Sequence, residues 1–165
     1  MDEQRGFLHK KQFRGLPLPA GVYHQVVEIW TINNQGQILL TLRSLQKKEY
    51  GGFWENTAGA ARSGENARQA ARRELQEETG IRVQPEELHF LGSHKEESCF
   101  MDSFLVRKDI SLQEIILQPG ETEQVKWVTL QELDQLIADG ELAAPVALRL
   151  QPLRQQIETA LRIPR

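Results

Sequence analysis

Three glutamates, Glu74, Glu77 and Glu78, occupy positions i, i+3 and i+4 of one predicted helix. This spacing places their side chains on the same helix face, where like charges repel one another. We expect the basic residues of the helix to leave these charges uncompensated, so that a hard divalent cation is their natural counter-charge. Carboxylate oxygens suit Mg²⁺ or Mn²⁺, and Mg²⁺ commonly shares its remaining coordination positions with substrate phosphates.

The chemistry open to a cation held by this cluster is hydrolysis of a phosphate compound. Such a cation polarises a phosphoryl oxygen and lowers the pKa of a bound water, and a further carboxylate can take the proton that the water releases. Acidic helix ends are also common on solvated surfaces. The residues around the cluster must therefore decide between these two interpretations.

The carboxylates need a helix that lies against a sheet, and the sequence predicts one over residues 66–79. Asn66 can cap its first turn, with Gln69 in the capping-box position, and Gly80 stands where a helix-terminating glycine belongs. A narrow apolar stripe of small side chains recurs every four residues at Ala67, Ala71 and Leu75. Side chains of this size let the helix approach a sheet closely.

The rest of the chain mixes strand and helix patterns. Segments rich in β-branched and aromatic residues predict strands at 22–32, 38–42, 53–57, 88–92, 100–107 and 125–128. Residues 33–36, Asn-Asn-Gln-Gly, join the first two strands as a hairpin, and 44–52 form a charged loop. Further helices are predicted from Thr129, with Glu132 in its capping box, and from near Pro152. This order favours α/β or α+β layers.

Length and charge exclude several classes of protein. A chain of 165 residues with 39% hydrophobic residues can close one core. A net charge of −3 gives no field that would draw in a nucleic acid polymer, and none is expected as a partner. The only cysteine, Cys99, excludes an internal disulfide and a cysteine-built zinc site. No signal peptide or membrane span is visible, so we expect a cytoplasmic protein without a membrane partner.

Two regions are predicted along the chain. Residues 1–20 are polar and basic, with Lys10, Lys11 and Arg14, and contain Pro17 and Pro19, which favour an extended N-terminal arm. Residues 21–165 contain no linker or repeat and are expected to form a single domain.

The segment 59–81 reads Gly-x5-Glu-x7-Arg-Glu-Leu-x-Glu-Glu-x-Gly-Ile. Its nine defined positions over 23 residues resemble the signature of the Nudix hydrolase family at every fixed position. The flanking strands, charged loop and late capped helix are also similar to the family's domain, from about residue 21 to residue 142. The resemblance implies a Nudix-type α/β/α sandwich with a mixed central sheet.

The resemblance also implies a metal site. Glu77 and Glu78 match the family's principal metal ligands, and Glu74 matches a position that binds a further metal or serves as the base. The backbone carbonyl of Gly59 matches an additional ligand, because glycine lets the backbone come close to an ion. The implied cofactor is Mg²⁺, with Mn²⁺ as a substitute.

Further residues are implied in catalysis and substrate binding. Arg73 matches an arginine that orients a neighbouring glutamate, and Glu65 matches a helper carboxylate. Family members often draw one more acidic residue from a loop outside the signature. Glu121 is the first candidate and Glu123 the second, although a solvated loop glutamate fits either position equally well. Residues that could contact the substrate from outside the signature are Arg43, Lys47 and Trp54.

The implied reaction is attack by water on a diphosphate linked to another group, X. The substrate would be a small molecule, either a nucleoside diphosphate derivative or a nucleoside triphosphate. Family members specific for ADP-ribose tend to carry a proline where this chain has Glu96, which argues against that substrate. Family members are often homodimers, and a homodimer is an expectation here.

Two alternatives stay open. The segments 21–24, which includes His24, and 54–59 resemble isopentenyl-diphosphate isomerase, a relative in which a histidine at that position binds metal. Ala58, Ala60 and Ala61 stand where the isomerase needs a catalytic cysteine, and we expect the distant Cys99 to be a buried packing residue. The other alternative is a non-catalytic diphosphate-binding domain.

Overall fold

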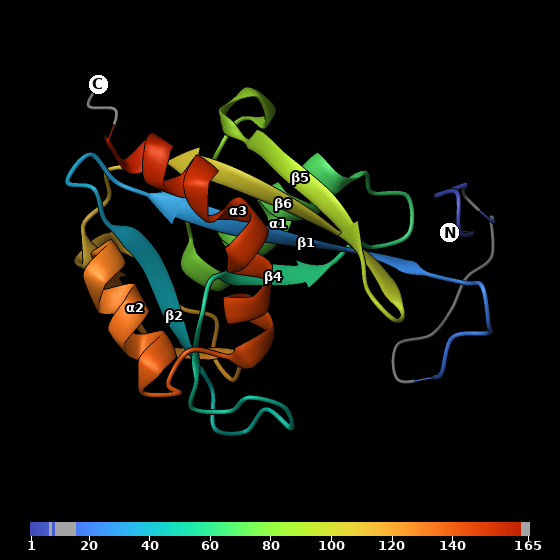
Figure 1. Ribbon diagram of the computed structural model, residues 1–165, viewed down its shortest axis with the longest axis horizontal. Helices are drawn as coiled ribbons and strands as arrows, with labels where there is room; N and C mark the ends of the chain where they lie inside the picture. The colour runs from blue at the N-terminus through green and yellow to red at the C-terminus, as the bar shows by residue number, and fades with distance from the viewer. Residues whose placement is uncertain (7, 9–15, 163–165) are drawn as a thin grey trace.

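The computed structural model describes residues 1–6, 8 and 16–162. The basic residues Lys10, Lys11 and Arg14 of the predicted arm lie outside them. Within the described residues, helices cover both faces of a seven-stranded sheet (Figure 1). The strands are β1 (His24–Ile32), β2 (Ile38–Arg43), β3 (Trp54–Glu55), β4 (Thr57–Ala60), β5 (His89–Lys95), β6 (Cys99–Arg107) and β7 (Thr122–Val128). The α-helices are α1 (Ala67–Thr79), α2 (Leu130–Ala138) and α3 (Ala144–Arg162), with single 3-10 turns at Pro85–Glu87 and Leu112–Glu114.

The sheet is mixed, as predicted. Its main order is β3-β2-β1-β6-β5, with β4 also paired to β1 and β7 to β2. Strands β1 and β6 run parallel, whereas the other pairs are antiparallel. The predicted hairpin is confirmed, but β1 and β2 pair only beside its turn, at Ile32 and Ile38. Beyond that point β1 pairs with β4 while β2 pairs with β3 and β7, so the two halves of the sheet diverge.

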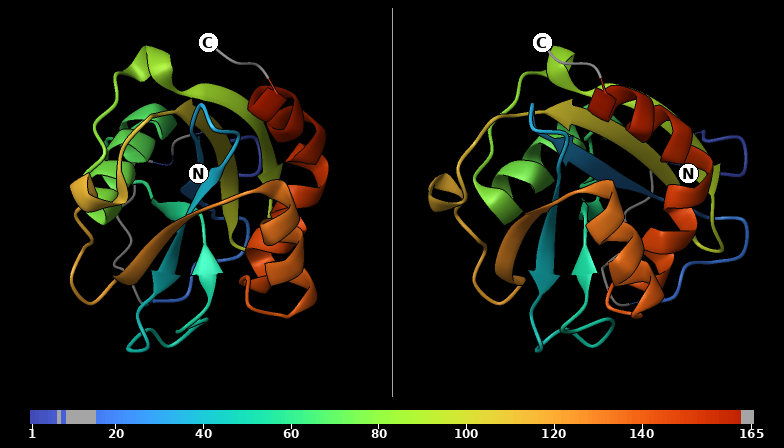
Figure 2. Two further views of the ribbon diagram at one scale, coloured as in Figure 1. Left: turned by 90° about the vertical axis from the view of Figure 1, so that its left-hand side faces the viewer. Right: turned by 60° about the vertical axis from the view of Figure 1, so that its left-hand side comes forward.

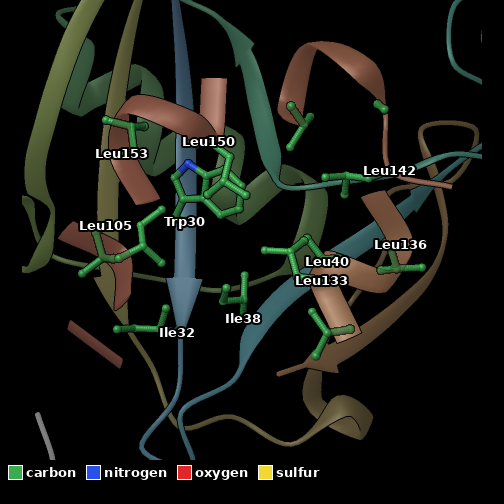
Figure 3. Close-up of a cluster of buried hydrophobic side chains, with 14 residues drawn as sticks. Trp30, Ile32, Ile38, Leu40, Leu105, Leu133, Leu136, Leu142, Leu150 and Leu153 are labelled. Carbon is green, nitrogen blue, oxygen red and sulfur yellow. The ribbon is translucent and has the colours of Figure 1, made fainter. Parts of the chain in front are cut away.

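Successive side chains along a strand point to opposite faces of the sheet, and this alternation divides the interior into two cores. Val27 and Ile29 of β1 pack with the apolar stripe of α1, which is confirmed as a packing surface. Trp30 and Ile32 point to the opposite face, where they pack with α2 and α3 (Figure 3). Figure 2 shows α1 on one side of the sheet and α2 and α3 on the other. The predicted α/β/α sandwich is therefore confirmed.

Two predicted elements differ from the structure. Helix α3 begins at Ala144 and runs through Pro152, because an apolar stripe continues on both sides of the proline and buries Val146, Leu150, Leu153 and Ile157. The predicted strand 53–57 is two short strands, since the chain changes pairing partner from β2 to β1 at Asn56. None of the described helices is long and apolar enough to cross a membrane.

Candidate active site

Helix α1, which carries the three glutamates, is capped at both ends. The Asn66 side chain accepts a hydrogen bond from the backbone N–H of Gln69, and the Gln69 side chain accepts one from the backbone N–H of Asn66. Gly80 ends the helix in the left-handed conformation, with φ of 75°, and its N–H donates to the carbonyl of Gln76. The predicted capping box and terminating glycine are confirmed. Glutamates 74, 77 and 78 therefore have fixed directions relative to the sheet.

Arg73 joins the carboxylates into one network. Its Nε lies 2.7 Å from Glu65 Oε1, and its Nη1 lies 2.7 Å from Glu74 Oε1 and 3.1 Å from Glu77 Oε2. Nη2 donates to the Ala60 carbonyl at 3.0 Å. These partners raise the pKa of Arg73, with the hydrogen bond to Glu65 as the largest cause, and Arg73 in turn lowers the pKa of Glu65.

This network corrects one expectation about the helix charges. We expected the basic residues of the helix to leave the glutamates uncompensated, but Arg73 precedes Glu77 by one helical turn and pairs with it. Arg62 also approaches Glu77, at 3.0 Å. Glu74 and Glu77 are thus paired with guanidinium groups. Glu78 is the remaining carboxylate of the cluster.

Glu78 is buried without a full set of partners. It is 8% exposed, and among the described residues its Oε2 has no hydrogen-bond partner. Burial raises the pKa of Glu78 well above its ordinary value, and the negative charges of Glu55, Glu74 and Glu121 raise it further. Burying an unpaired charge is costly unless a counter-charge is present. A divalent cation with oxygen ligands fits both the donor type and the excess of negative charge at this position.

The backbone of Gly59, in β4, lies in close contact with the glutamate cluster. A Cβ built at this position would lie well within 3.0 Å of the carboxyl carbon and both carboxyl oxygens of Glu74. The Glu74 carboxylate therefore occupies space that any side chain at position 59 would fill. The pairing of β4 with β1 and its packing against α1 create this approach.

These groups face a pocket of about 960 Å³. Its charged lining includes Arg43, Lys47, Arg62, Arg73, Glu74, Glu77, Glu78 and Glu121, and its apolar lining includes Gly59 and the neighbouring alanines. Arg43 Nη1 donates to both carboxyl oxygens of Glu55, at 2.8 and 2.9 Å, and Lys47 forms an ion pair with Glu121. Cations beside a carboxylate cluster suit a ligand that carries phosphates together with a divalent metal.

A comparison with models of protein families identifies the family of this sequence. A family model described as the NUDIX domain matches residues 22–150. The chain belongs to the Nudix family. It is 34% identical over 142 residues to a protein named Uncharacterized Nudix hydrolase lin0387 from Listeria innocua, covering 86% of this chain and 84% of that protein. It is also 28% identical to an isopentenyl-diphosphate Delta-isomerase of Dictyostelium discoideum, covering 72% of this chain and 59% of the isomerase.

Solved structures support the same fold. The crystal structure of DR0079 from Deinococcus radiodurans has a TM-score of 0.71 and 27% identity, covering 86% of this chain and 90% of that one. Another similar structure is a bifunctional NMN adenylyltransferase/ADP ribose pyrophosphatase from Francisella tularensis, solved with AMP and a Mn ion. It has a TM-score of 0.64 and 22% identity, and the match covers 82% of this chain and 42% of that one. Divalent metals are typical of the Nudix family, and the Francisella structure holds manganese.

Outside the Nudix signature, the structure separates the two candidate acidic residues of the loop. Residue Arg43 of β2 is paired with Thr122 of β7, and the backbone N–H of Ser44 donates to the Glu121 carbonyl at 2.8 Å. This places Glu121 in the pocket lining beside Lys47. Glu123 is not among the lining residues, and it accepts hydrogen bonds from Ser44 Oγ at 2.8 Å and from the Leu45 N–H at 3.0 Å.

Trp54 lies apart from the Nudix pocket. It packs against the core between the sheet and helices α2 and α3, and Lys126 Nζ lies 3.8 Å from its ring centroid. By contrast, Arg43 and Lys47, the other two residues predicted to contact substrate, do line the pocket.

Sequence reasoning missed Glu55, which is 8% exposed and holds Arg43 in place. Its pKa is raised by burial, against the lowering effect of Arg43. No local signal identified Glu55, because its partner is twelve residues away on another strand.

Proposed function

We propose that this chain is a Mg²⁺-dependent pyrophosphohydrolase that cleaves the anhydride of a diphosphate attached to an organic group X. Nucleoside diphosphate derivatives and nucleoside triphosphates are the first substrates to test. The observation that carries the proposal is Glu78, a buried carboxylate with an oxygen that has no hydrogen-bond partner in the part of the chain that the structure describes. It lies beside two further glutamates and a pocket lined by cations. A solvated acidic helix face has no reason to bury such a group.

The oxygen donors present are of the type that suits a divalent cation, although no three carboxylates of the described residues are already arranged to hold one. Glu77, Glu78, Glu74 and the Gly59 carbonyl would hold it, as oxygen donors of the kind that Mg²⁺ and Mn²⁺ prefer. When bound, it would supply charge neutralisation for the diphosphate and acidify a water. Arg73 keeps Glu74 and Glu77 directed at the pocket through hydrogen bonds of 2.7 and 3.1 Å.

Catalysis by the chain's own groups would consist of proton transfer and orientation. Water attacks one phosphorus, the bridging P–O bond breaks, and the leaving phosphate departs with the bridging oxygen. Glu121 is our choice for the group that takes the proton from the attacking water, because it lines the pocket from a loop. Arg43 and Lys47 would bind phosphate oxygens once these oxygens compete with their present carboxylate partners.

Isomerisation of isopentenyl diphosphate is less well supported. The only cysteine, Cys99, is buried, and it is not among the residues that line the pocket. Burial raises the pKa of its thiol to about 12, with Glu96 adding to the effect. Ala58, Ala60 and Ala61 line the pocket instead and offer no nucleophile or proton donor from their side chains.

The test is a phosphate-release screen of nucleoside triphosphates, dinucleotides, nucleotide sugars and isoprenoid diphosphates, with Mg²⁺ and with Mn²⁺. We expect metal-dependent hydrolysis of at least one compound and loss of turnover by about 100-fold or more in Glu77→Gln. Circular dichroism and Glu86→Gln, which alters an exposed glutamate, control for folding and for general charge effects. Normal turnover in Glu77→Gln, or no hydrolysis of any compound, would contradict the proposal.

A further inference from the structure

Glu77, a candidate metal ligand, has both of its arginine partners on one carboxylate oxygen. Arg62 Nη2 lies 3.0 Å from Glu77 Oε2, and Arg73 Nη1 lies 3.1 Å from the same atom. Both guanidinium groups are positive, so a divalent cation at the same carboxylate is repelled by each of them. Cation binding by Glu77 therefore becomes stronger when one of the two arginines moves away.

The two arginines differ in how firmly they are held. The side chain of Arg73 is 14% exposed, and it also donates to both carboxyl oxygens of Glu65 and to the Ala60 carbonyl. The side chain of Arg62 is 63% exposed, and within the described residues Glu77 is its only hydrogen-bond partner. An exposed ion pair of this kind contributes little to stability. Arg62 is thus the arginine that can leave Glu77.

The backbone of residue 62 stays beside the pocket when the side chain moves. The N–H of Arg62 donates to Glu65 Oε2 at 2.8 Å, and the same oxygen is bound by Arg73. The N–H of the preceding residue, Ala61, donates to the Gln25 carbonyl of β1 at 2.8 Å. A guanidinium released from Glu77 therefore stays close to the pocket that Arg62 lines, on a flexible stem with a fixed root.

A diphosphate would offer the released guanidinium new acceptors. The planar guanidinium group binds phosphate oxygens through two parallel hydrogen bonds, and these charge-assisted bonds are strong. The other lysine and arginine side chains in the pocket lining, Arg43, Lys47 and Arg73, are each less exposed than that of Arg62. Arg62 is therefore the cation of the lining with the greatest freedom to follow a ligand.

We propose that Arg62 is a substrate-binding residue, which exchanges Glu77 for a phosphate of the diphosphate when the metal site is filled. This inference rests on the proposed function and adds a residue to it. In the metal-free protein the Arg62 guanidinium neutralises Glu77. In the loaded protein it binds a phosphate, while Arg73 keeps its place. Arg62 therefore opposes binding of the metal alone and favours binding of the diphosphate.

Arg62→Ala tests the exchange through two binding measurements with opposite expected signs. The variant keeps the hydrogen bond to Glu65, because the backbone N–H donates it. Without substrate, Mn²⁺ titrated by electron paramagnetic resonance binds about two- to fivefold more tightly than to wild type, the range of an exposed ion pair. At one saturating Mn²⁺ concentration, calorimetry measures methylenebisphosphonate, a diphosphate analogue that cannot be cleaved at its P–C–P bridge. Its binding weakens by about tenfold.

The opposite signs separate this role from a merely structural one, which would weaken the binding of both ligands. Arg82→Ala is the matched control for the loss of a positive charge, because Arg82 is an exposed arginine outside the pocket lining. The control keeps the wild-type affinity for both ligands. Weaker Mn²⁺ binding in Arg62→Ala, unchanged binding of methylenebisphosphonate, or equal changes in Arg82→Ala overturns the inference.

The inference and the proposed function can fail separately. Hydrolysis that is lost in Glu77→Gln, together with wild-type affinities in Arg62→Ala, keeps the pyrophosphohydrolase and removes the role of Arg62. If the wild type hydrolyses no compound, the two binding measurements still test Arg62. Tighter Mn²⁺ and weaker methylenebisphosphonate binding in Arg62→Ala then support the exchange in a diphosphate-binding domain. A wild type that binds neither ligand overturns both proposals.

Discussion

The carboxylate of Glu74 lies directly against the backbone of Gly59, in the space that a side chain at position 59 would occupy. Glu74 comes from α1 and Gly59 from β4, so this contact fixes the distance between the helix and the sheet edge at the candidate metal site. Arg73 holds the same carboxylate from the other side. The position of Glu74 therefore depends on both neighbours.

Gly59→Ala should displace Glu74 and reduce turnover by about 100-fold, because a misplacement of about 1 Å in a catalytic group can cost that much. Phosphate release and a Mn²⁺ titration measure the effect on rate and on metal affinity. Gly92→Ala is the matched control, since a Cβ there meets only Leu153 Cδ2, at the ordinary contact distance of 3.8 Å. Unchanged activity in Gly59→Ala would show that Glu74 is not needed where it lies.

Glu78→Gln should stabilise the metal-free protein by roughly 1–3 kcal/mol at neutral pH, because it removes a charge that is buried and incompletely partnered. The pKa of Glu78 in the folded protein is raised above its ordinary value of 4.5. The folded state therefore binds the proton more tightly than the unfolded state, and stability falls as pH rises from about 4.5 through the folded pKa.

Urea unfolding of the metal-free proteins across that pH range measures this effect. The difference in free energy of unfolding between Glu78→Gln and wild type should grow with pH and then level off. Added Mg²⁺ should stabilise the wild type more than the variant, because the ion binds the folded carboxylate. A pH-independent difference, or equal stabilisation by Mg²⁺, would argue against Glu78 as a buried ligand.

Glu121→Gln should lower kcat by about 100-fold or more, as expected for loss of a general base. Glu123→Gln should change kcat little, because Glu123 is not among the pocket-lining residues and accepts hydrogen bonds from Ser44 and Leu45. The two variants share chemistry and loop region, so each controls for the other. A larger kcat loss in Glu123→Gln would reverse the assignment.

Arg73→Lys should reduce activity by about 10–100-fold, since an ammonium group cannot reproduce bonds to Glu65, Glu74 and Glu77 together. Arg154→Lys is the control, because Arg154 also pairs with two acidic residues but lies on α3, with its side chain 35% exposed. Its replacement should change stability by about 1 kcal/mol or less and leave activity unchanged. Equal activity losses in both variants would indicate a general effect of removing a guanidinium group.

Much of the fold followed from local patterns. The capping box at Asn66 and the terminating Gly80 marked α1 because both act within one helical turn. The helix from Thr129 was likewise marked by its cap. The start of α3 was missed, since a local rule about Pro152 was outweighed by apolar side chains that pack against the sheet. The boundary of the arm at residue 20, the homodimer and the cytoplasmic location stay predictions.

The sequence by itself determined the spacing of the glutamates, because helical periodicity depends only on hydrogen bonds between residues close in the chain. It also determined membership of the family, through one short signature. Only the tertiary structure decided that Glu121 enters the pocket while Glu123 does not, that Gly59 meets Glu74, and that Leu16 reaches the same site. These approaches depend on strand pairing between distant segments and on the divergence of β1 and β2, which local residue patterns do not encode.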